Sequence, residues 1–228
     1  MTIPKKTAPR KGRRAAIVAG LRTPFVKSNG HFKDLTTLDL GAALVTELMA
    51  RTNLDPTEVD RLIYGLVVAS VGNANIAREI VLATNLPRAV DAHSVTRACA
   101  TSTQSLADAA QAIEAGEADV AICGGGDSLS NPPIRFSDKF VKVLMKANGA
   151  KDPMDKAKAF LSLKPKDLMP VLPAIKEYST GQTMGESAEQ MAKDNGISRE
   201  DQDLLAQRSH QRAAAAWEKG LYDQEVMA

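Results

Sequence analysis

The stretch DAHSVTRACATSTQSLADAAQAIEAGEADVAICGGGDS, residues 91–128, sets the class of the fold. Residues 91–96 have the length of a short strand, and residues 99–115 predict a long alanine-rich helix that Gly116 closes. Residues 118–128 predict another strand, which runs into a glycine turn. A strand, a helix and a strand in this order indicate an α/β fold.

The residues before this stretch continue the same alternation. Residues 14–25 predict a buried strand, residues 36–53 a helix, residues 61–69 a strand and residues 73–85 a helix. The apolar runs AAIVAG and DVAICGGG are nearly unbroken, which is typical of strands that are buried on both sides. We therefore expect an α/β sheet with helices on both of its faces.

The alternation stops near residue 129. Between residues 139 and 176 there are nine lysines, three aspartates and no glutamate, and the apolar clusters are short. This composition predicts an inserted, mostly helical loop subdomain with a basic face. The expected organisation is a basic tail at 1–13, a main domain at 14–128 and 183–228, and the insertion at 129–182. Within the main domain, Ser198 and Asp201 predict the capped start of a long helix.

Composition narrows the class of protein. The 228 residues are 44% hydrophobic and 25% charged with a net charge of +2, which is typical of a soluble globular protein and gives no sign of nucleic-acid binding. Two cysteines are too few for a disulfide scaffold, and three scattered histidines show no metal-ligand spacing. The basic tail lacks the apolar core of a secretory signal, and no run is long enough to span a membrane. We expect a cytoplasmic protein without a bound metal.

Cys99 lies where a predicted strand meets a predicted helix. The unpaired N–H groups and the dipole at a helix start lower the pKa of a thiol, and they can also hydrogen-bond a carbonyl oxygen that the sulfur attacks. Arg97 can add positive charge. The alternative is that Cys99 is a small buried side chain, as we expect for Cys123 in its apolar strand. Both interpretations stay open at this point, because neither His93 nor His210 is placed as an obvious base.

Seven segments occur together, in one order, along most of the chain. They are RTPF, DLG, NIARE, SVTRACATS, AICGGGDSLS, MGESAEQMA and RSHQRAAAAWEKG. This set resembles the thiolases, in particular the bacterial 3-ketoacyl-CoA thiolases of fatty-acid oxidation and the β-subunit of the trifunctional complex. The resemblance extends over residues 14–228 and implies the first of two similar layered α/β/α halves, with a mostly helical loop insertion.

The resemblance also implies roles for individual residues. Cys99 matches the family's nucleophile, which carries the acyl group as a thioester and whose own N–H belongs to the oxyanion hole. Met184 and Gly185 match a loop that lines the substrate pocket near the thioester. Asp127 stands where the family usually has glutamate, which says little about the chemistry. The family's Gly-His-Pro, Asn-Glu-Ala-Phe and Cys-x-Gly segments, with the acid/base residues, do not occur in these 228 residues. We therefore expect an N-terminal part that is inactive by itself.

The implied reaction is ping-pong acyl transfer, in which 3-ketoacyl-CoA and CoA give acetyl-CoA and a shortened acyl-CoA. Coenzyme A is then a substrate, and no bound cofactor is expected. The implied partners are a second copy in a homodimer, a hydratase/dehydrogenase α-subunit, and a membrane surface contacted by the lysine-rich residues 138–170; no nucleic acid is implied. Two further functions stay open, a ketoacyl-synthase-like condensing enzyme and a non-catalytic folding or interaction fragment.

Overall fold

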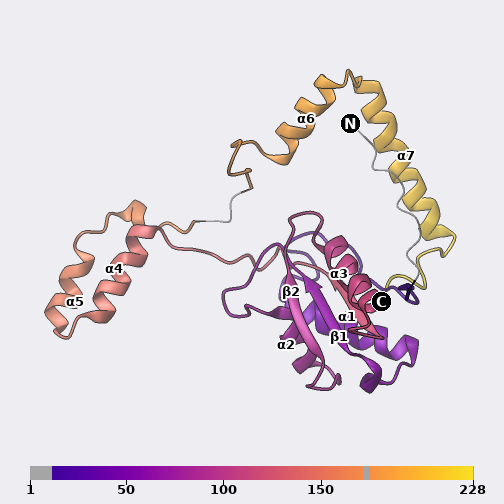
Figure 1. Ribbon diagram of the computed structural model, residues 1–228. Helices are drawn as coiled ribbons and strands as arrows, with labels where there is room; N and C mark the ends of the chain where they lie inside the picture. The colour runs from indigo at the N-terminus through magenta and orange to yellow at the C-terminus, as the bar shows by residue number, and fades with distance from the viewer. Residues whose placement is uncertain (1–11, 172–174, 228) are drawn as a thin grey trace. The chain divides into compact units, whose positions relative to one another are not determined.

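The computed structural model describes residues 12–171 and 175–227, which fall into two units. The sheet unit contains residues 12–131 and 222–227, and the helical unit contains the described residues between 132 and 221. The elements of the sheet unit are α1 (Thr37–Thr52), the 3-10 helix η1 (Pro56–Glu58), β1 (Arg61–Gly65), α2 (Ile76–Ala83), β2 (Asp91–Val95), α3 (Thr101–Ala115) and β3 (Ala121–Gly125). Those of the helical unit are α4 (Asp138–Gly149), α5 (Pro153–Phe160), the 3-10 helix η2 (Pro165–Leu168), α6 (Met184–Asp194) and α7 (Arg199–Glu218) (Figure 1).

Three parallel strands form the sheet, in the order β2–β1–β3. Arg61 of β1 lies opposite both Asp91 of β2 and Ala121 of β3, so the three strands begin at one level. Helices α2 and α3 make the connections, because parallel strands need a crossover. The carboxyl ends of the strands share one edge of the sheet, the edge at which α/β folds place their functional residues. The chain leaves β2 at this edge and leads to Cys99.

Alternate residues of β1 face two different helical layers. Leu62 and Tyr64 belong to a buried cluster that also contains Val45 of α1 and Ile80 of α2. The opposite face carries α3, whose first residue lies against Gly65. The expected α/β sheet with helices on both faces is therefore confirmed, and Figure 1 shows β1 between these layers.

Residues 14–25 do not form the predicted strand. Within the described part of the chain, their backbone makes one isolated bridge, between Arg22 and Val226. The Arg22 N–H donates to the Glu225 carbonyl at 2.8 Å, and the Arg22 carbonyl accepts from the Met227 N–H at 3.0 Å. The predicted burial is also wrong, since Ile17, Val18 and Phe25 are exposed. A strand needs a neighbouring backbone along its edge, which an apolar pattern cannot supply.

Helices α4 and α5 pack together in the helical unit. Val143 and Ala147 of α4 and Ala159 of α5 form a small buried cluster. Lys139 of α4 pairs with Asp167 of η2 at 2.6 Å, which holds the connection after α5 in place. The predicted helical character of this lysine-rich segment is confirmed. Residues 1–11 of the predicted basic tail lie outside the described residues.

Helices α6 and α7 begin with side-chain caps and bury little surface. The Ser198 hydroxyl accepts from the Asp201 N–H at 3.0 Å, which confirms the predicted start of α7. None of the residues of α7 is buried, and Ala192 is the single buried residue of α6. Contacts place α6 and α7 in the helical unit, and their membership of the main domain stays a prediction. Of the helices in the described part of the chain, none combines the length and hydropathy needed to cross a bilayer.

Candidate active site

Cys99 lies on a tight turn between β2 and α3, and it is exposed. The Arg97 carbonyl accepts from the Ala100 N–H at 3.1 Å, which closes the turn. Ala98 has a φ of 46°, in the left-handed region that few residues other than glycine adopt. The helix begins at Thr101, two residues later than the sequence predicts. The thiol nevertheless lies at the N-terminal end of α3, so the predicted placement at a helix start holds.

The start of α3 has no side-chain cap. Every other α-helix within the described ranges has one, supplied by Thr36, Asn75, Ser137, Asp152, Thr183 and Ser198. At α3, no described residue accepts a hydrogen bond from the N–H groups of Cys99, Ser102 or Thr103. Free N–H groups at a helix start carry partial positive charge. This turn can therefore present donors to a carbonyl oxygen beside the thiol.

Two glycines bring the start of α3 against the sheet. A Cβ atom on Gly65 would lie 2.3 Å from the methyl carbon of Thr101. A Cβ atom on Gly125 would lie 2.4 Å from the Gly65 carbonyl oxygen and 2.9 Å from the Ser102 hydroxyl. No larger residue fits at either position without a shift of the neighbouring backbone. The close approach fixes the turn that carries Cys99 at the carboxyl edge of the sheet.

Asp127 connects two loops at the same edge. Its carboxylate accepts from the Val67 N–H at 3.0 Å and from the Val68 N–H at 2.7 Å, so it joins the end of β3 to the segment after β1. Burial and, second, the charge of Asp127 raise the pKa of Tyr64 to about 12. Sequence reasoning assigned no role to Asp127, and the structure gives it this structural one.

The two cysteines have different surroundings. Cys123 lies in β3 and is partly buried, and this burial raises the pKa of its thiol. It fits the predicted packing role, since a raised pKa keeps the sulfur protonated and unreactive at neutral pH. Cys99 is exposed on its turn. Exposure is what a nucleophile needs to reach a substrate, and it argues against the buried alternative for Cys99.

Within the described residues of the sheet unit, no hydrogen bond joins His93 of β2 to the Cys99 thiol. His210 lies in α7 of the helical unit, so a role as base for Cys99 stays untested. The Arg97 guanidinium donates to the side-chain carbonyl of Gln104, farther along α3. This contact gives Arg97 a packing role on the helix surface, and its effect on the thiol stays a prediction.

Met184 and Gly185 are the first two residues of α6. Thr183 and Glu186 form a capping box around them, with the Glu186 N–H donating to the Thr183 hydroxyl at 3.2 Å. Met184 is exposed. Both residues belong to the helical unit and Cys99 to the sheet unit, so their predicted approach to the thioester stays a prediction.

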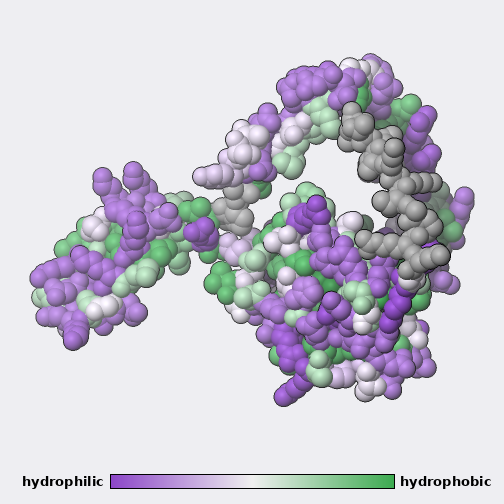
Figure 2. Space-filling view, in the orientation of Figure 1, coloured by the Kyte–Doolittle hydropathy of each residue, from purple (hydrophilic) through white to green (hydrophobic). Residues whose placement is uncertain are grey.

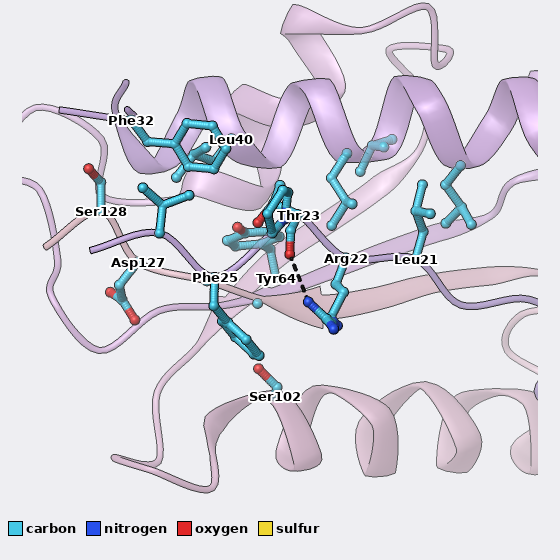
Figure 3. A pocket seen from close by; sticks show the side chains of 18 of the residues that line it. Leu21, Arg22, Thr23, Phe25, Phe32, Leu40, Tyr64, Ser102, Asp127 and Ser128 are labelled. Atoms are coloured by element: carbon cyan, nitrogen blue, oxygen red, sulfur yellow. Dashed lines mark hydrogen bonds between the residues drawn. The ribbon is translucent and has the colours of Figure 1, made fainter. Parts of the chain in front are cut away.

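A cavity of about 620 Å³ in the sheet unit is lined by residues 19–28 and by parts of α1, β1 and β3. Figure 3 shows Phe25 and Ser102 facing one another on one side of it and Phe32 with Leu40 on the other. A second cavity, of about 350 Å³, is lined by residues 15–19, by β3 and by parts of α1 and α3. Cys99 lines neither cavity, so we assign neither to the thioester. Among the described residues, no group of three or more His, Cys, Asp or Glu side chains is arranged to hold a metal ion.

These features define an α/β protein with an exposed cysteine at the uncapped start of a helix, on the carboxyl edge of a parallel sheet. The family described as thiolase, N-terminal domain, matches residues 15–228, and the chain belongs to the thiolase family.

Proteins similar to this chain carry related names. It is 51% identical to a 3-ketoacyl-CoA thiolase of Serratia proteamaculans, over 96% of this chain and 50% of that protein. It is 50% identical to a 3-ketoacyl-CoA thiolase of Aeromonas salmonicida, over 99% of this chain and 52% of that protein. The chain therefore spans about half the length of these curated relatives.

Solved structures share the fold. The acetyl-CoA acetyltransferase of Bacillus anthracis matches with a TM-score of 0.78 and 25% identity, over 95% of this chain and 50% of that one. The Acat5 thiolase of Ascaris suum, solved in complex with coenzyme A, matches with a TM-score of 0.76 and 24% identity, over 92% of this chain and 50% of that one. These likenesses agree with the layered α/β arrangement predicted from the sequence.

Proposed function

We propose that the protein containing this chain is an acetyl-CoA C-acyltransferase, which cleaves 3-ketoacyl-CoA with CoA through a thioester on Cys99. The exposed position of Cys99 at the uncapped start of α3 is the observation that carries the proposal. The names of relatives near 50% identity supply the substrate class.

The chemistry divides one carbon–carbon cleavage into two transfers. The Cys99 thiolate attacks the 3-keto carbon, and the bond between carbons 2 and 3 breaks. The leaving carbanion takes a proton and departs as acetyl-CoA. The thiolate of a second CoA then attacks the acyl-enzyme, releases the shortened acyl-CoA and regenerates the Cys99 thiolate. The free N–H groups at the start of α3 suit the negative charge that develops on the attacked carbonyl oxygen.

The competing functions have weaker support. A condensing enzyme would use the same cysteine, but the relatives described above are named thiolases. A folding or interaction fragment would not need an exposed thiol on a left-handed turn, because such a turn is unfavourable unless the surrounding structure maintains it.

The test is thioester formation by the protein produced from the intact gene. Incubation with acetyl-CoA followed by peptide mass mapping should find one acetyl group on Cys99 and none on Cys123. The variant Cys99→Ser should lose thiolysis by at least about 10³-fold, as expected when a covalent nucleophile is removed. The matched variant Cys123→Ser should retain most of the activity. Acetylation elsewhere, with full activity of Cys99→Ser, would exclude the proposal.

Met184 and Gly185 are proposed to line the substrate pocket. Met184 has an exposed, flexible and apolar side chain, which suits contact with an acyl chain. Met184→Ala should raise the KM for a long 3-ketoacyl-CoA more than for acetoacetyl-CoA. Met191→Ala, a change to another exposed methionine of α6, serves as the control. An equal change in KM in the two variants would show that Met184 does not line the substrate pocket.

Three assembly properties are part of the proposal. A homodimer is supported by β2, whose outer edge has no strand partner in the described sheet, because an open edge can pair with a second copy.

A cytoplasmic location is supported by two free cysteines, which suit a reducing compartment. A division into a main domain at 14–128 and 183–228 and an insertion at 129–182 is also proposed, and the family match over 15–228 extends across both parts. Light scattering of the purified protein tests the dimer directly.

The α4–α5 pair is proposed to contact an anionic membrane surface or a hydratase/dehydrogenase subunit. Lys142 and Lys146 lie one helical turn apart on α4 and are exposed, and Met145 beside them is 70% exposed. Figure 2 shows hydrophilic and hydrophobic side chains side by side on this pair of helices. A helix that exposes lysines beside apolar side chains is typical of contact with an anionic surface. Lys139 is unsuitable for a test, because it pairs with Asp167 inside the unit.

The double variant Lys142→Glu and Lys146→Glu should weaken binding to phosphatidylglycerol vesicles by roughly tenfold or more, since each lysine near such a surface contributes about 1 kcal/mol. Acyl transfer at Cys99 should be unchanged. Lys33→Glu, in the sheet unit, controls for the reversal of a single exposed lysine outside α4. If vesicle binding and binding to the partner subunit are unchanged while the KM for CoA rises, the lysines form a substrate surface.

A further inference from the structure

Thr101 is a buried threonine whose hydroxyl lies inside the turn that carries Cys99. We infer that Thr101 is a positioning residue, which holds this turn in its left-handed conformation and so fixes the Cys99 thiol and N–H. The inference rests on the proposed role of Cys99 as nucleophile. It adds to that role a residue that touches no substrate.

The hydroxyl makes two hydrogen bonds that span the turn. The Arg97 N–H donates to the Thr101 hydroxyl at 2.7 Å, and the hydroxyl donates to the Ala98 carbonyl at 2.6 Å. The Thr101 N–H donates to the same carbonyl at 3.2 Å. One side chain therefore satisfies backbone groups on both sides of the Ala98 Cα atom. The bond from the Ala100 N–H to the Arg97 carbonyl closes the same turn from the backbone side.

Ala98 needs such support. Its φ of 46° is unfavourable for a residue with a Cβ atom, and alanine has no side-chain group that could stabilise the turn by itself. Without the hydroxyl, the Arg97 N–H would lose its partner and the Ala98 carbonyl would keep one of its two donors. Relaxation of Ala98 toward ordinary φ values would rotate the next residue, which is Cys99. The thiol and its free N–H would then leave their common orientation.

The methyl group of Thr101 fixes the rotamer of the hydroxyl. It occupies the space that the absent Cβ of Gly65 leaves, since a Cβ there would lie 2.3 Å from it. The side chain is 4% exposed, so water cannot replace the hydroxyl in its two bonds. Size and hydrogen bonding can thus be varied separately. Thr101→Ser keeps the hydroxyl without the methyl group, and Thr101→Val keeps the shape without the hydroxyl.

Ser105 offers a matched control on the same helix. It is fully buried, and its single hydroxyl proton is shared between the Ser102 carbonyl, at 2.7 Å, and the Gly124 carbonyl, at 2.9 Å. The contact with Gly124 ties α3 to β3, and neither contact involves residues 97–99. Ser105→Ala therefore removes a buried hydroxyl of similar kind without changing the support of Ala98.

The experiment uses the protein from the intact gene and measures three quantities for each variant: the pH profile of Cys99 alkylation by iodoacetamide, kcat and KM for thiolysis, and thermal stability. Thr101→Val should lower the alkylation rate and kcat by roughly tenfold to a hundredfold, as expected for a reacting group displaced by about 1 Å. Thr101→Ser should stay within about threefold of wild type. Ser105→Ala should lower thermal stability and leave the Cys99 pH profile in place. If Thr101→Val does not fold, the comparison is made between Thr101→Ala and Thr101→Ser.

Two results would overturn the inference. One is a Thr101→Val variant whose Cys99 alkylation rate and kcat equal those of the wild type. The other is a Ser105→Ala variant that loses as much alkylation rate and kcat as Thr101→Val does. Failure of the proposed function gives a different result, because the wild-type protein then forms no thioester with acetyl-CoA. The difference in Cys99 alkylation rate between Thr101→Val and Thr101→Ser still decides whether Thr101 positions Cys99.

Discussion

The sheet unit and the helical unit differ in how many apolar side chains they bury. The sheet unit has one cluster of twelve buried apolar side chains, drawn from its helices, its strands and the loops between them. In the helical unit, the corresponding cluster has three members, and the twenty residues of α7 include none that is buried. Since burial of apolar surface is the dominant favourable contribution to folding, the two units should differ greatly in local stability.

Helix caps and ion pairs within single helices stabilise the helical unit, which buries few apolar side chains. Each of its α-helices has a side-chain cap, and ion pairs four residues apart join Glu189 to Lys193 and Arg199 to Asp203. A cap contributes about 1 kcal/mol and an exposed ion pair a few tenths of a kcal/mol. The sheet unit should therefore retain its amide protons longest, and α7 should exchange first. Four predictions can break or sharpen this contrast.

The largest effect is expected in the sheet core. Ile80 of α2 is completely buried, and Ile80→Ala should lower the free energy of unfolding by about 3 kcal/mol, since the lost transfer energy adds to that of a cavity. Leu82→Ala, on the same helix but 47% exposed, should lower it by less than about 1 kcal/mol. Urea unfolding measures both. Equal losses would mean that the twelve-residue cluster does not carry the stability of this unit.

Next comes the close contact beneath Cys99. Gly65→Ala places a methyl group 2.3 Å from Thr101 and should lower the free energy of unfolding by about 2 kcal/mol through overpacking. Gly124→Ala, with open space around its Cβ position, should change it by less than about 1 kcal/mol. Cys99 alkylation should slow in the first variant alone. Unchanged alkylation in Gly65→Ala would show that the turn tolerates movement of α3.

A smaller loss is expected in the helical unit. Val143→Ala removes two methyl groups from the three-residue cluster of α4 and α5, which corresponds to about 1.5 kcal/mol. Hydrogen exchange should accelerate in these two helices and stay at its wild-type rate in the strands. Faster exchange in β1 would show that the two units unfold as one, and the contrast between them would fail.

The smallest effect concerns pH. The Asp119 and Val120 N–H groups donate to Asp60 and hold the pKa of its carboxyl below the ordinary value. A folded pKa below the unfolded one gives stability that is present above about pH 4 and is lost as the pH falls through the folded pKa. Asp60→Asn should remove this part of the acid sensitivity. Thermal unfolding near pH 6 and near pH 3 measures it, and an identical acid sensitivity in the variant would contradict the assignment.

Much of the fold follows from local pattern. The predicted order of strands and helices matches β1, β2 and β3 and the helices between them, and Gly116 ends α3 with a φ of 79° as expected of a glycine there. The position of Cys99 at a helix start followed from the same pattern. Residues 14–25 misled this kind of reasoning, because pairing depends on which backbone lies alongside and not on composition.

The finer geometry of the site was beyond local pattern. Ala98 lies between the strand predicted at 91–96 and the helix predicted at 99–115, and nothing in its residue type indicates the positive φ that the structure shows. Thr101 and Asp127 act through backbone groups of other residues, so their residue types carried no visible signal. The uncapped start of α3 could have been suspected, because Ala100 is not a residue that caps a helix.

The outer edge of β3 has a consequence for handling the chain. Residues 15–19 line a cavity together with β3 but do not pair with it, so in the described part of the chain one side of this strand offers unpaired peptide groups. Such an edge is a template for other extended chains, and apolar neighbours strengthen the attraction. A preparation of these 228 residues at high concentration should therefore form β-rich aggregates seeded at Ala121–Gly125.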